Sequence, residues 1–215
     1  MRILPYENVN EVAEAVEKEL RSRATRKVLR VFLPTGKTPL PLYKIMREDP
    51  EFWKSHLEGI QIDDFIDRSR PFFSQLDAEL VRPIGIKLSA WDPKFSSNDI
   101  IEYTKRIIAQ PIDVAILGLG PNGHVGFHEP GVSKSFEGGK LEVTEETRVK
   151  SKGPTRNVLS FGVGAFLKAD AIFLIVTGEE KRLIFEKFME TEPTSGLPAT
   201  LLKTHKNLIV FTDLD

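Results

Sequence analysis

The amino-acid sequence predicts an α/β fold, with a mostly parallel, doubly wound sheet and helices on both of its faces. Strand-like and helix-like segments alternate along the chain, which indicates repeated β–α–β units. The later strand-like segments are apolar at almost every position, as in PIDVAILGLG (111–120) and ADAIFLIVTG (169–178). Parallel strands have this composition because helices bury both of their faces. At 215 residues the chain suits one such domain, and we expect a single domain over residues 1–215.

The N-terminal half supplies the first elements in turn. Helical periodicity places Val12, Val16 and Leu20 on one side of a helix over 8–24. An apolar run then predicts a buried strand over 27–35. The elements that follow are, in order, a helix over 39–48 that Thr38 caps and Pro39 opens, a strand over 59–65, a helix around 76–80 and an amphipathic helix over 97–110.

The C-terminal half repeats the strand-then-helix pattern. The run over 111–120 ends in glycines, as a central parallel strand does. The apolar strand over 169–178 precedes a helix over 179–191, and a last strand is predicted over 206–213. Residues 130–155 are richer in Gly, Ser, Lys and Glu, and we expect a small β-rich excursion there that forms a flap or lid.

Composition excludes several classes of function. A net charge of −1 gives no overall field that would favour nucleic acid or an anionic membrane as a partner. The absence of cysteine excludes disulfides and thiolate chemistry. No apolar stretch approaches the roughly 18 residues of a membrane span, and the N-terminus becomes charged too early for a signal peptide. We therefore expect a cytoplasmic protein.

Ligands of parallel sheets bind beyond the carboxyl ends of the strands, so these ends are the first places to search for a site. The first is Thr35-Gly36-Lys37-Thr38. It is not a P-loop, because that motif requires a glycine where Val31 stands. A glycine turn before a helix can still bind an anion through free N–H groups. The alternative is an ordinary turn with a solvated Lys37.

The second strand end carries two adjacent carboxylates, Asp63 and Asp64. Neighbours on a strand point to opposite faces, so the two would not share a proton. One can then act as a base that faces the cleft while the other caps or supports the next element. The alternative is a pair of turn-forming acids before a loop.

The third strand end, LGLGPNGHVGFHEPG (117–131), is the most informative stretch. Its glycines allow the backbone to approach a ligand closely, and Asn122, His124, His128 and Glu129 lie among them. An imidazole near a carboxylate suits proton transfer to a sugar or carbonyl oxygen. The loop is not a dinucleotide fingerprint, since no strand-end acid follows about twenty residues later. A metal site is disfavoured because the HExxH order is absent, and a glycine-rich turn with exposed histidines is the simpler alternative.

In this order the three stretches resemble the motifs of the glucosamine-6-phosphate deaminase (glucosamine-6-phosphate isomerase) family, within the wider group that includes 6-phosphogluconolactonases. The matching residues are Leu33-Pro34-Thr35-Gly36-Lys37-Thr38-Pro39, Asp63-Asp64-Phe65 and Pro121-Asn122-Gly123-His124-Val125-Gly126-Phe127-His128-Glu129-Pro130. The likeness extends to the C-terminus through Thr147-Arg148-Val149, Gly162-Val163-Gly164, Gly178 with Lys181, and Pro198-Ala199-Thr200 with His205. The Gly-His-x-x-Phe-x-Glu-Pro element is the specific part, because lactonases usually lack its second half.

The resemblance implies a role for each predicted site residue. Residues 35–38 would cradle the phosphate of a sugar, with Lys181 as a countercharge. Asp63 would be the base that moves a proton between C2 and C1 of the opened sugar. The loss of ammonia from C2 would then give fructose 6-phosphate. These are proton transfers, so the resemblance implies neither a cofactor nor a metal.

Ring opening is the step that the resemblance assigns to the third stretch. His124, oriented by Glu129 and helped by Asn122, would shuttle a proton at the ring oxygen and the C1 hydroxyl. The catalytic set implied by the resemblance is therefore Asp63, Asn122, His124 and Glu129.

The sequence also departs from the family pattern. Lys37 replaces a glycine, Asp64 and Phe65 replace Glu and Tyr, and His128 replaces Asn. The stretch between residues 148 and 162 is short, and no residue aligns with the family's lid arginine. The candidates to substitute for that arginine are Lys150, Lys152 and Arg156, and we place Lys152 in the predicted phosphate site.

Three functions follow from these observations. The first is a deaminating isomerase of glucosamine 6-phosphate or a close amino-sugar phosphate such as galactosamine 6-phosphate. The second is a 6-phosphogluconolactonase, and the third is a sugar-phosphate-binding regulator without turnover. A regulator could dispense with Asp63, His124 and Glu129, yet all three are present. In each case the expected partner is a small sugar phosphate, and the sequence leaves oligomeric state and effectors open.

Overall fold

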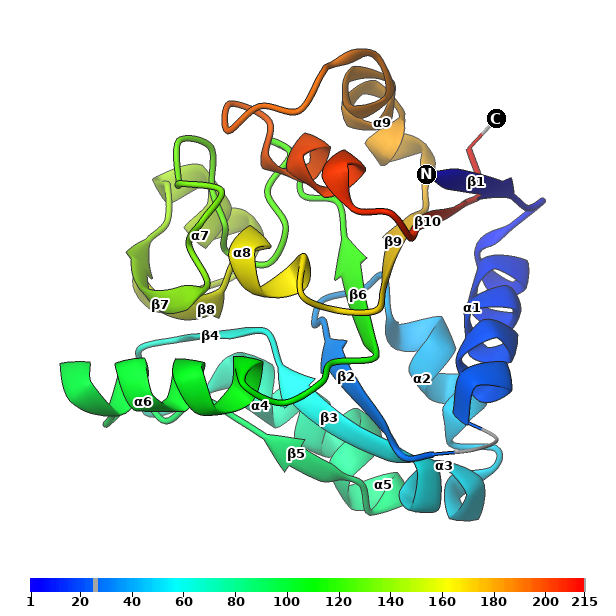
Figure 1. Ribbon diagram of the computed structural model, residues 1–215, viewed down its shortest axis with the longest axis horizontal. Coiled ribbons are helices and arrows are strands. Elements are labelled where there is room, and N and C mark those ends of the chain that lie inside the picture. Colours follow the sequence, from blue (N-terminus) through cyan, green and yellow to red (C-terminus); the bar gives the residue numbers. More distant parts are fainter. Residues whose placement is uncertain (25–26, 215) are drawn as a thin grey trace.

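The computed structural model describes residues 1–24 and 27–214. Its central sheet has seven strands in the order β1-β10-β9-β6-β2-β3-β5 (Figure 1). Every pairing between neighbours in this sheet is parallel. The strands are β1 (Arg2–Pro5), β2 (Leu29–Leu33), β3 (Leu57–Gln61), β5 (Lys87–Ser89), β6 (Val114–Gly118), β9 (Ala171–Val176) and β10 (Leu208–Thr212). The predicted parallel sheet is confirmed.

Helices cover both faces of this sheet because successive strand residues point to opposite sides. In β9, Ala171, Phe173 and Ile175 pack into one hydrophobic cluster, while Ile172 and Leu174 pack into the other. The first cluster is covered by α1 (Val9–Ala24), α2 (Leu40–Met46), α3 (Pro50–His56), α4 (Pro71–Leu76), the π-helix η1 (Asp77–Val81) and α5 (Arg82–Ile84). The second is covered by α6 (Ser97–Ile108), α8 (Val163–Phe166), α9 (Arg182–Glu190) and the 3₁₀ helix η3 (Pro198–Thr204). The doubly wound arrangement is therefore confirmed.

A small antiparallel sheet lies beside the central one. It contains β4 (Asp63–Phe65), β8 (Asn157–Phe161) and β7 (Gly138–Glu142), in that spatial order. Strand β7 and helix α7 (Glu145–Lys150) both come from the predicted excursion over 130–155. That excursion is therefore part strand and part helix.

The strand predicted over 59–65 is wrong as a single element. The structure divides it into β3 and β4, which belong to different sheets. The break falls at Ile62, whose carbonyl accepts hydrogen bonds from Phe161 N at 2.9 Å and from Trp91 Nε1 at 3.0 Å. Both donors are distant in sequence, and they direct the chain from the central sheet into the small one.

Two helix starts also differ from the sequence prediction. Helix α2 has Pro39 as its N-cap, with no side-chain cap, so Thr38 does not cap it. The helix expected around 76–80 begins earlier, at Pro71, because the Asp64 carboxylate accepts hydrogen bonds from the N–H groups of Phe72 and Phe73.

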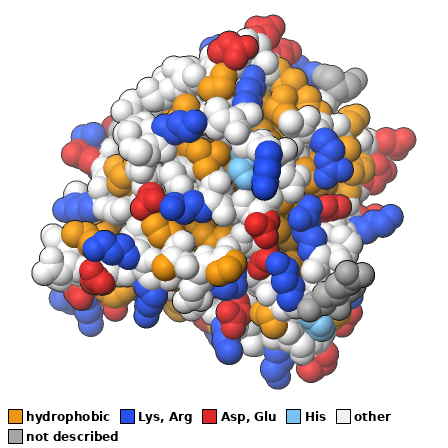
Figure 2. Space-filling view, viewed as in Figure 1, with side chains coloured by type: hydrophobic (Ala, Val, Ile, Leu, Met, Phe, Trp, Pro, Cys, Tyr) orange, Lys and Arg blue, Asp and Glu red, His pale blue; other side chains and the backbone are white. Residues whose placement is uncertain are grey.

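The surface mixes charges of both signs. Figure 2 shows acidic and basic side chains interspersed over one face, in keeping with the net charge of −1. Within residues 1–24 and 27–214, no helix is both long and apolar enough to cross a membrane.

Candidate active site

The carboxyl ends of three central strands meet at one edge of the sheet. The turn after β2 approaches the end of β6, because a Cβ built on Gly118 would lie 4.0 Å from Thr38 Oγ1. The 3₁₀ helix η2 (Glu179–Lys181), which follows β9, reaches the same place: Lys181 Nζ donates to the Leu119 carbonyl at 2.9 Å. Thr38 and Lys181 therefore converge on adjacent residues at the end of β6, as expected for parallel strands.

Asp63 lies against the loop that carries the predicted imidazole. A Cβ built on Gly126 would lie 3.4 Å from Asp63 Oδ2 and 2.8 Å from a methyl of Ile62. Gly126 also has a φ of +58°, which favours glycine. A larger residue at position 126 would therefore clash with Ile62 and touch the Asp63 carboxylate. The structure thus brings together the second and third predicted stretches, which are about sixty residues apart in sequence.

The surroundings of Asp63 favour a proton on its carboxyl group. The residue is 5% exposed, and no described residue donates a hydrogen bond to its side chain. Burial raises the pKa of Asp63 well above its usual range, and the neighbouring Asp64 charge adds to this effect. Once ionised, such a carboxylate is a stronger base than an exposed aspartate.

Asp64 has the opposite environment. Its carboxylate accepts hydrogen bonds from Gln61 Nε2 and Phe73 N, both at 2.9 Å, and from Phe72 N at 3.1 Å. The N–H of Phe65 donates a fourth at 2.9 Å. Burial raises the pKa of Asp64, while these hydrogen bonds lower it. Asp64 therefore caps α4, and Asp63 on the opposite face of β4 is the carboxylate left for chemistry.

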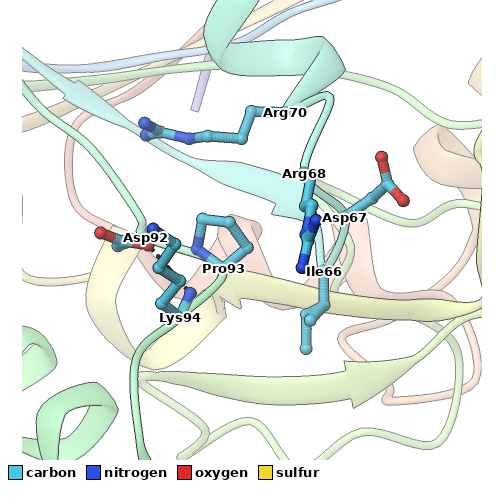
Figure 3. A pocket seen from close by; sticks show the side chains of 7 residues that line it. All are labelled: Ile66, Asp67, Arg68, Arg70, Asp92, Pro93 and Lys94. Carbon is cyan, nitrogen blue, oxygen red and sulfur yellow. Dashed lines mark hydrogen bonds between the residues drawn. The ribbon is translucent and has the colours of Figure 1, made fainter.

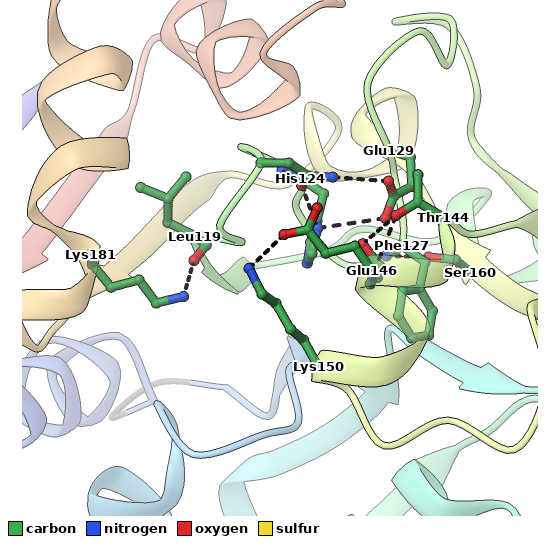
Figure 4. Close-up of polar contacts among 11 residues, drawn as sticks. Leu119, His124, Phe127, Glu129, Thr144, Glu146, Lys150, Ser160 and Lys181 are labelled. Carbon is green, nitrogen blue, oxygen red and sulfur yellow. Dashed lines mark hydrogen bonds and ion pairs between the residues drawn. The ribbon is translucent and has the colours of Figure 1, made fainter.

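Asn122, His124 and Glu129 form a connected chain, of which Figure 4 labels His124 and Glu129. Asn122 Oδ1 lies 2.7 Å from His124 Nδ1, and Asn122 Nδ2 donates to Glu129 Oε2 at 3.0 Å. An amide oxygen can only accept, so Nδ1 of the imidazole carries the proton and Nε2 is left as an acceptor. Glu129 Oε1 lies 3.6 Å from His124 Nδ1 and is buried without a hydrogen-bond donor among the described residues. The carboxylate can therefore stabilise an imidazolium when one forms.

The His124 ring lies directly on Gly120. A Cβ built at position 120 would be 2.3 Å from His124 Nε2, far inside van der Waals contact. Burial, together with the charges of Lys181 and Lys150, lowers the pKa of His124 from its ordinary value of 6.5 to about 4. His124 is therefore a neutral imidazole near pH 7.

Two lysines face the same space as His124. Figure 4 shows Lys150 reaching in from α7 and Lys181 from the start of α9. Lys150 Nζ donates to Glu146 Oε1 at 2.7 Å. Burial lowers the pKa of Lys181, and the Lys150 charge adds to this effect. Lys152, the residue predicted at the phosphate site, is exposed and has a φ of +53° just beyond the end of α7. The structure thus brings Lys150, rather than Lys152, into electrostatic contact with the cluster.

The turn over 35–38 is held by a residue that the sequence analysis missed. Gln75 on α4 accepts from Gly36 N at 3.1 Å and donates to Gly36 O at 2.7 Å. Gly36 has a φ of +89°, so its turn needs glycine. The Gly36 N–H is therefore engaged, while Lys37 is exposed and Thr35 is half-buried. Because 39 residues separate the two partners, no local pattern indicates this contact.

His128 is a structural residue. It is fully buried, and its Nε2 donates to the Val132 carbonyl at 3.2 Å. Its Nδ1 accepts from Val163 N at 3.2 Å. Both ring nitrogens are thus occupied by backbone groups, which leaves neither for a metal or for substrate.

The chain is similar to known proteins over nearly its whole length. The family model described as glucosamine-6-phosphate isomerases/6-phosphogluconolactonase matches residues 5–210. A glucosamine-6-phosphate deaminase of Bacillus cytotoxicus is 27% identical over 99% of this chain and 87% of its own length. One of Bacillus cereus is 28% identical over the same shares.

Solved structures share the fold. The structure of a monomeric glucosamine-6-phosphate deaminase has a TM-score of 0.89 and 20% identity, and the alignment covers 99% of this chain and 97% of that one. A 6-phosphogluconolactonase from Shewanella baltica has a TM-score of 0.82 and 16% identity over the same shares. Both deaminases and lactonases are therefore built on this architecture.

Proposed function

Because the chain belongs to the family of glucosamine-6-phosphate isomerases and 6-phosphogluconolactonases, we propose that it is a deaminating aldose–ketose isomerase. Its substrate is glucosamine 6-phosphate or a close amino-sugar phosphate such as galactosamine 6-phosphate. The observation that carries the proposal is the position of the buried Asp63 carboxylate against Gly126, in the loop that holds His124 and Glu129. A base and an imidazole that share one edge of the sheet can act on the same hexose.

The phosphate binds where positive charge gathers at the strand ends. Lys181 and Lys150 both face this space, and a phosphate bound there would offset the Lys150 charge, which adds to burial in lowering the pKa of Lys181. The hydroxyl groups of Thr35 and Thr38 and the exposed Lys37 complete the anchor on the side of β2. Held in this way, the phosphate fixes C2 of the sugar against Asp63.

Ring opening uses the neutral imidazole. His124 Nε2 accepts the proton of the C1 hydroxyl and returns it to the ring oxygen, which gives the open-chain aldehyde. Asn122 holds Nδ1 so that Nε2 faces the sugar, and Glu129 stabilises the imidazolium between the two transfers. Substrate phosphate offsets the two lysine charges, which raises the pKa of His124 toward the range in which it can exchange a proton.

Isomerisation and deamination follow at C2. Ionised Asp63 removes the C2 proton to give an enolamine, and the same proton returned to C1 gives an imine at C2. One water then adds to C2 and ammonia leaves. Glucosamine 6-phosphate and water thus become fructose 6-phosphate and ammonia, with His124 carrying the proton of ring opening and Asp63 the proton that moves from C2 to C1.

A 6-phosphogluconolactonase is the second candidate, because the family includes lactonases and lactonase structures share the fold. Ester hydrolysis needs a base for water but none at C2. Two features favour the deaminase: the curated relatives at 27–28% identity carry that name, and Asp63 is placed beside the imidazole loop. A binding regulator without turnover would need neither Asp63 nor the chain from Asn122 to Glu129.

The test is a substrate panel combined with one substitution. Purified protein is given glucosamine 6-phosphate, galactosamine 6-phosphate and 6-phosphogluconolactone, while ammonia, ketose and acid are followed separately. We expect ammonia and ketose in equal amounts from an amino sugar. Asp63→Asn should lower kcat by about a thousandfold, within the range for loss of a general base, and should leave KM nearly unchanged.

The matched control is Asp170→Asn, an exposed aspartate at the start of β9, which should behave as wild type. Acid from the lactone, with Asp63→Asn unaffected, would select the lactonase instead. Binding of all three compounds without turnover would select the regulator.

A further inference from the structure

A second cleft lies apart from the proposed catalytic centre. It has a volume of about 930 Å³ and opens between the loop after β4 and the loop after β5. Figure 3 shows its lining, which consists of Ile66, Asp67, Arg68, Arg70, Asp92, Pro93 and Lys94. None of these residues takes part in the catalytic scheme. The volume is in the range of pockets that hold small metabolites.

Three cations border this cleft and form no ion pair with a described residue. Within residues 1–24 and 27–214, Arg68, Arg70 and Lys94 form no ion pair. Among the described residues, Arg68 and Arg70 are thus two unpaired arginines that border the same hollow as Lys94.

Arg70 is fixed in place before any ligand arrives. Its Nη2 donates to the Trp91 carbonyl at 2.6 Å, and its guanidinium lies 3.9 Å from the centre of the Phe73 ring. Its Nε is buried and has no hydrogen-bond acceptor in the described part of the chain. The residue also adopts a φ of +44°, a left-handed conformation that costs about 1 kcal/mol for a residue other than glycine. A preorganised guanidinium loses little conformational entropy when it binds an anion.

The two acids of the lining each accept a hydrogen bond from a backbone N–H of their own loop. Asp67 Oδ1 accepts from Ser69 N at 2.8 Å, and Asp92 Oδ1 accepts from Lys94 N at 2.9 Å. Figure 3 shows the Asp67 carboxylate pointing away from Asp92 and Lys94, while Arg68, Arg70 and Lys94 border the cleft. The cleft therefore presents positive charge, with Ile66 and Pro93 as apolar surface beside it.

We propose that this cleft is a second anion site, which binds a phosphorylated small molecule. A phosphate dianion matches the forked donors of two arginines together with the point charge of a lysine. The rest of the ligand would lie on Ile66 and Pro93. The site is independent of the proposed reaction, because it shares no residue with the cluster around His124.

The test uses inorganic phosphate as the probe, at low ionic strength because surface charges are screened by salt. Arg68 and Lys94 are at the surface, so Arg68→Ala/Lys94→Ala should fold normally. The control Lys134→Ala/Lys206→Ala removes the same net charge from exposed positions elsewhere. Calorimetric titration should show phosphate binding in the cleft that is weakened about tenfold or more in the cleft variant and retained in the control.

Backbone amide NMR locates the binding. In wild type and control, phosphate should shift the amides of residues 66–70 and 92–94, and the cleft variant should lose these shifts while keeping any shifts at residues 35–38. The proposal is overturned if the cleft variant binds as the control does, or if only residues 35–38 respond. Failure of the catalytic proposal would instead appear as the absence of a response at 35–38.

Discussion

At the scale of single residues, the proposed chemistry depends on the protonation states of His124 and Asp63. His124 is neutral because it is buried against Gly120 and faces two lysines, while its Nδ1 proton is held by Asn122. Burial acts in the opposite direction on the Asp63 carboxyl group. Binding of substrate phosphate changes the charge around both groups, so we infer that the anion prepares the site as well as anchoring the sugar.

The lowered pKa of His124 predicts a specific loss of stability in acid. The unfolded chain binds a proton near pH 6.5, but the folded chain does so only near pH 4. The unfolded state therefore holds more protons between these values, and the stability that the neutral ring contributes is lost as pH falls through this window. Relative to His124→Asn, wild type should lose up to about 3 kcal/mol of unfolding free energy. Urea unfolding from pH 8 to pH 4 measures this.

Asp63 and Asp64 act in the opposite sense, because a raised carboxyl pKa favours the folded state as pH falls. Wild type and His124→Asn both contain these two aspartates. The difference between their curves of unfolding free energy against pH therefore reports the imidazole alone. Parallel curves from pH 6.5 to pH 4 would show that His124 titrates normally in the folded protein.

At the scale of elements, the short helix α4 connects the parts of the site. Asp64 caps its N-terminus, Gln75 near its C-terminus holds Gly36, and Phe72 stacks on Phe127 at a centroid distance of 5.4 Å. One helix of six residues thus contacts all three predicted strand-end stretches. A change at the C-terminal end of α4 should therefore move the turn over 35–38 while leaving Asp63 and His124 in place.

Gln75→Ala is the test of this connection. Without the two hydrogen bonds to Gly36, the turn loses its fixed shape, so KM should rise about five- to tenfold while kcat stays within about twofold. Gln75→Glu keeps the acceptor but loses the donor and adds a negative charge, and its KM should rise further. Steady-state kinetics with ammonia detection measures both.

Ser74→Ala, on the exposed side of the same helix, is the control and should leave KM unchanged. An unchanged KM in Gln75→Ala would mean that the turn keeps its shape without α4.

Element-scale prediction from sequence succeeded where a pattern is local. Apolar runs such as 111–120 and 169–178 gave central strands, because each is buried on both faces by neighbouring helices. It failed where residues distant in sequence determine where a strand ends. The division of 59–65 into β3 and β4 depends on Trp91 and Phe161, which no local pattern connects to Ile62. The short edge strands β1 and β5 were missed because their few residues are exposed or half-buried and give no apolar run.

The candidate site shows the same division. Strand alternation places Asp63 and Asp64 on opposite faces of β4, so the sequence could predict that only one of them supports the next element. The placement of Lys150 rather than Lys152 depends on where α7 ends, because Lys152 lies beyond its last turn in a left-handed conformation. Helix ends are the least certain feature of a sequence prediction. The contact from Gln75 to Gly36 depends on tertiary structure alone.

At the scale of the whole molecule, the site spans the two sheets. Lys181 is on η2, which follows β9 of the central sheet, whereas Lys150 is on α7 beside the small sheet. Like charges on the two parts repel, and an anion between them would hold the parts together. Fructose 6-phosphate, the proposed product, should therefore raise the unfolding temperature of the protein as its concentration increases.

Three lysine variants test this prediction by thermal unfolding. Lys150→Ala and Lys181→Ala should each reduce the temperature shift caused by fructose 6-phosphate, because each removes one countercharge. Lys152→Ala is the matched control and should keep the full shift. Equal shifts in all three variants would place the phosphate elsewhere.

The two neighbouring aspartates of β4 have a consequence for how this protein can change over time. In our proposal Asp63 is the reactive residue, because no described residue donates a hydrogen bond to its side chain, whereas four donors hold Asp64. If Asp63 were lost by mutation, Asp64 could not replace it, although the two residues are chemically identical neighbours. Moving the Asp64 carboxylate into the position of Asp63 would remove the cap of α4 and loosen the turn over 35–38 that Gln75 holds.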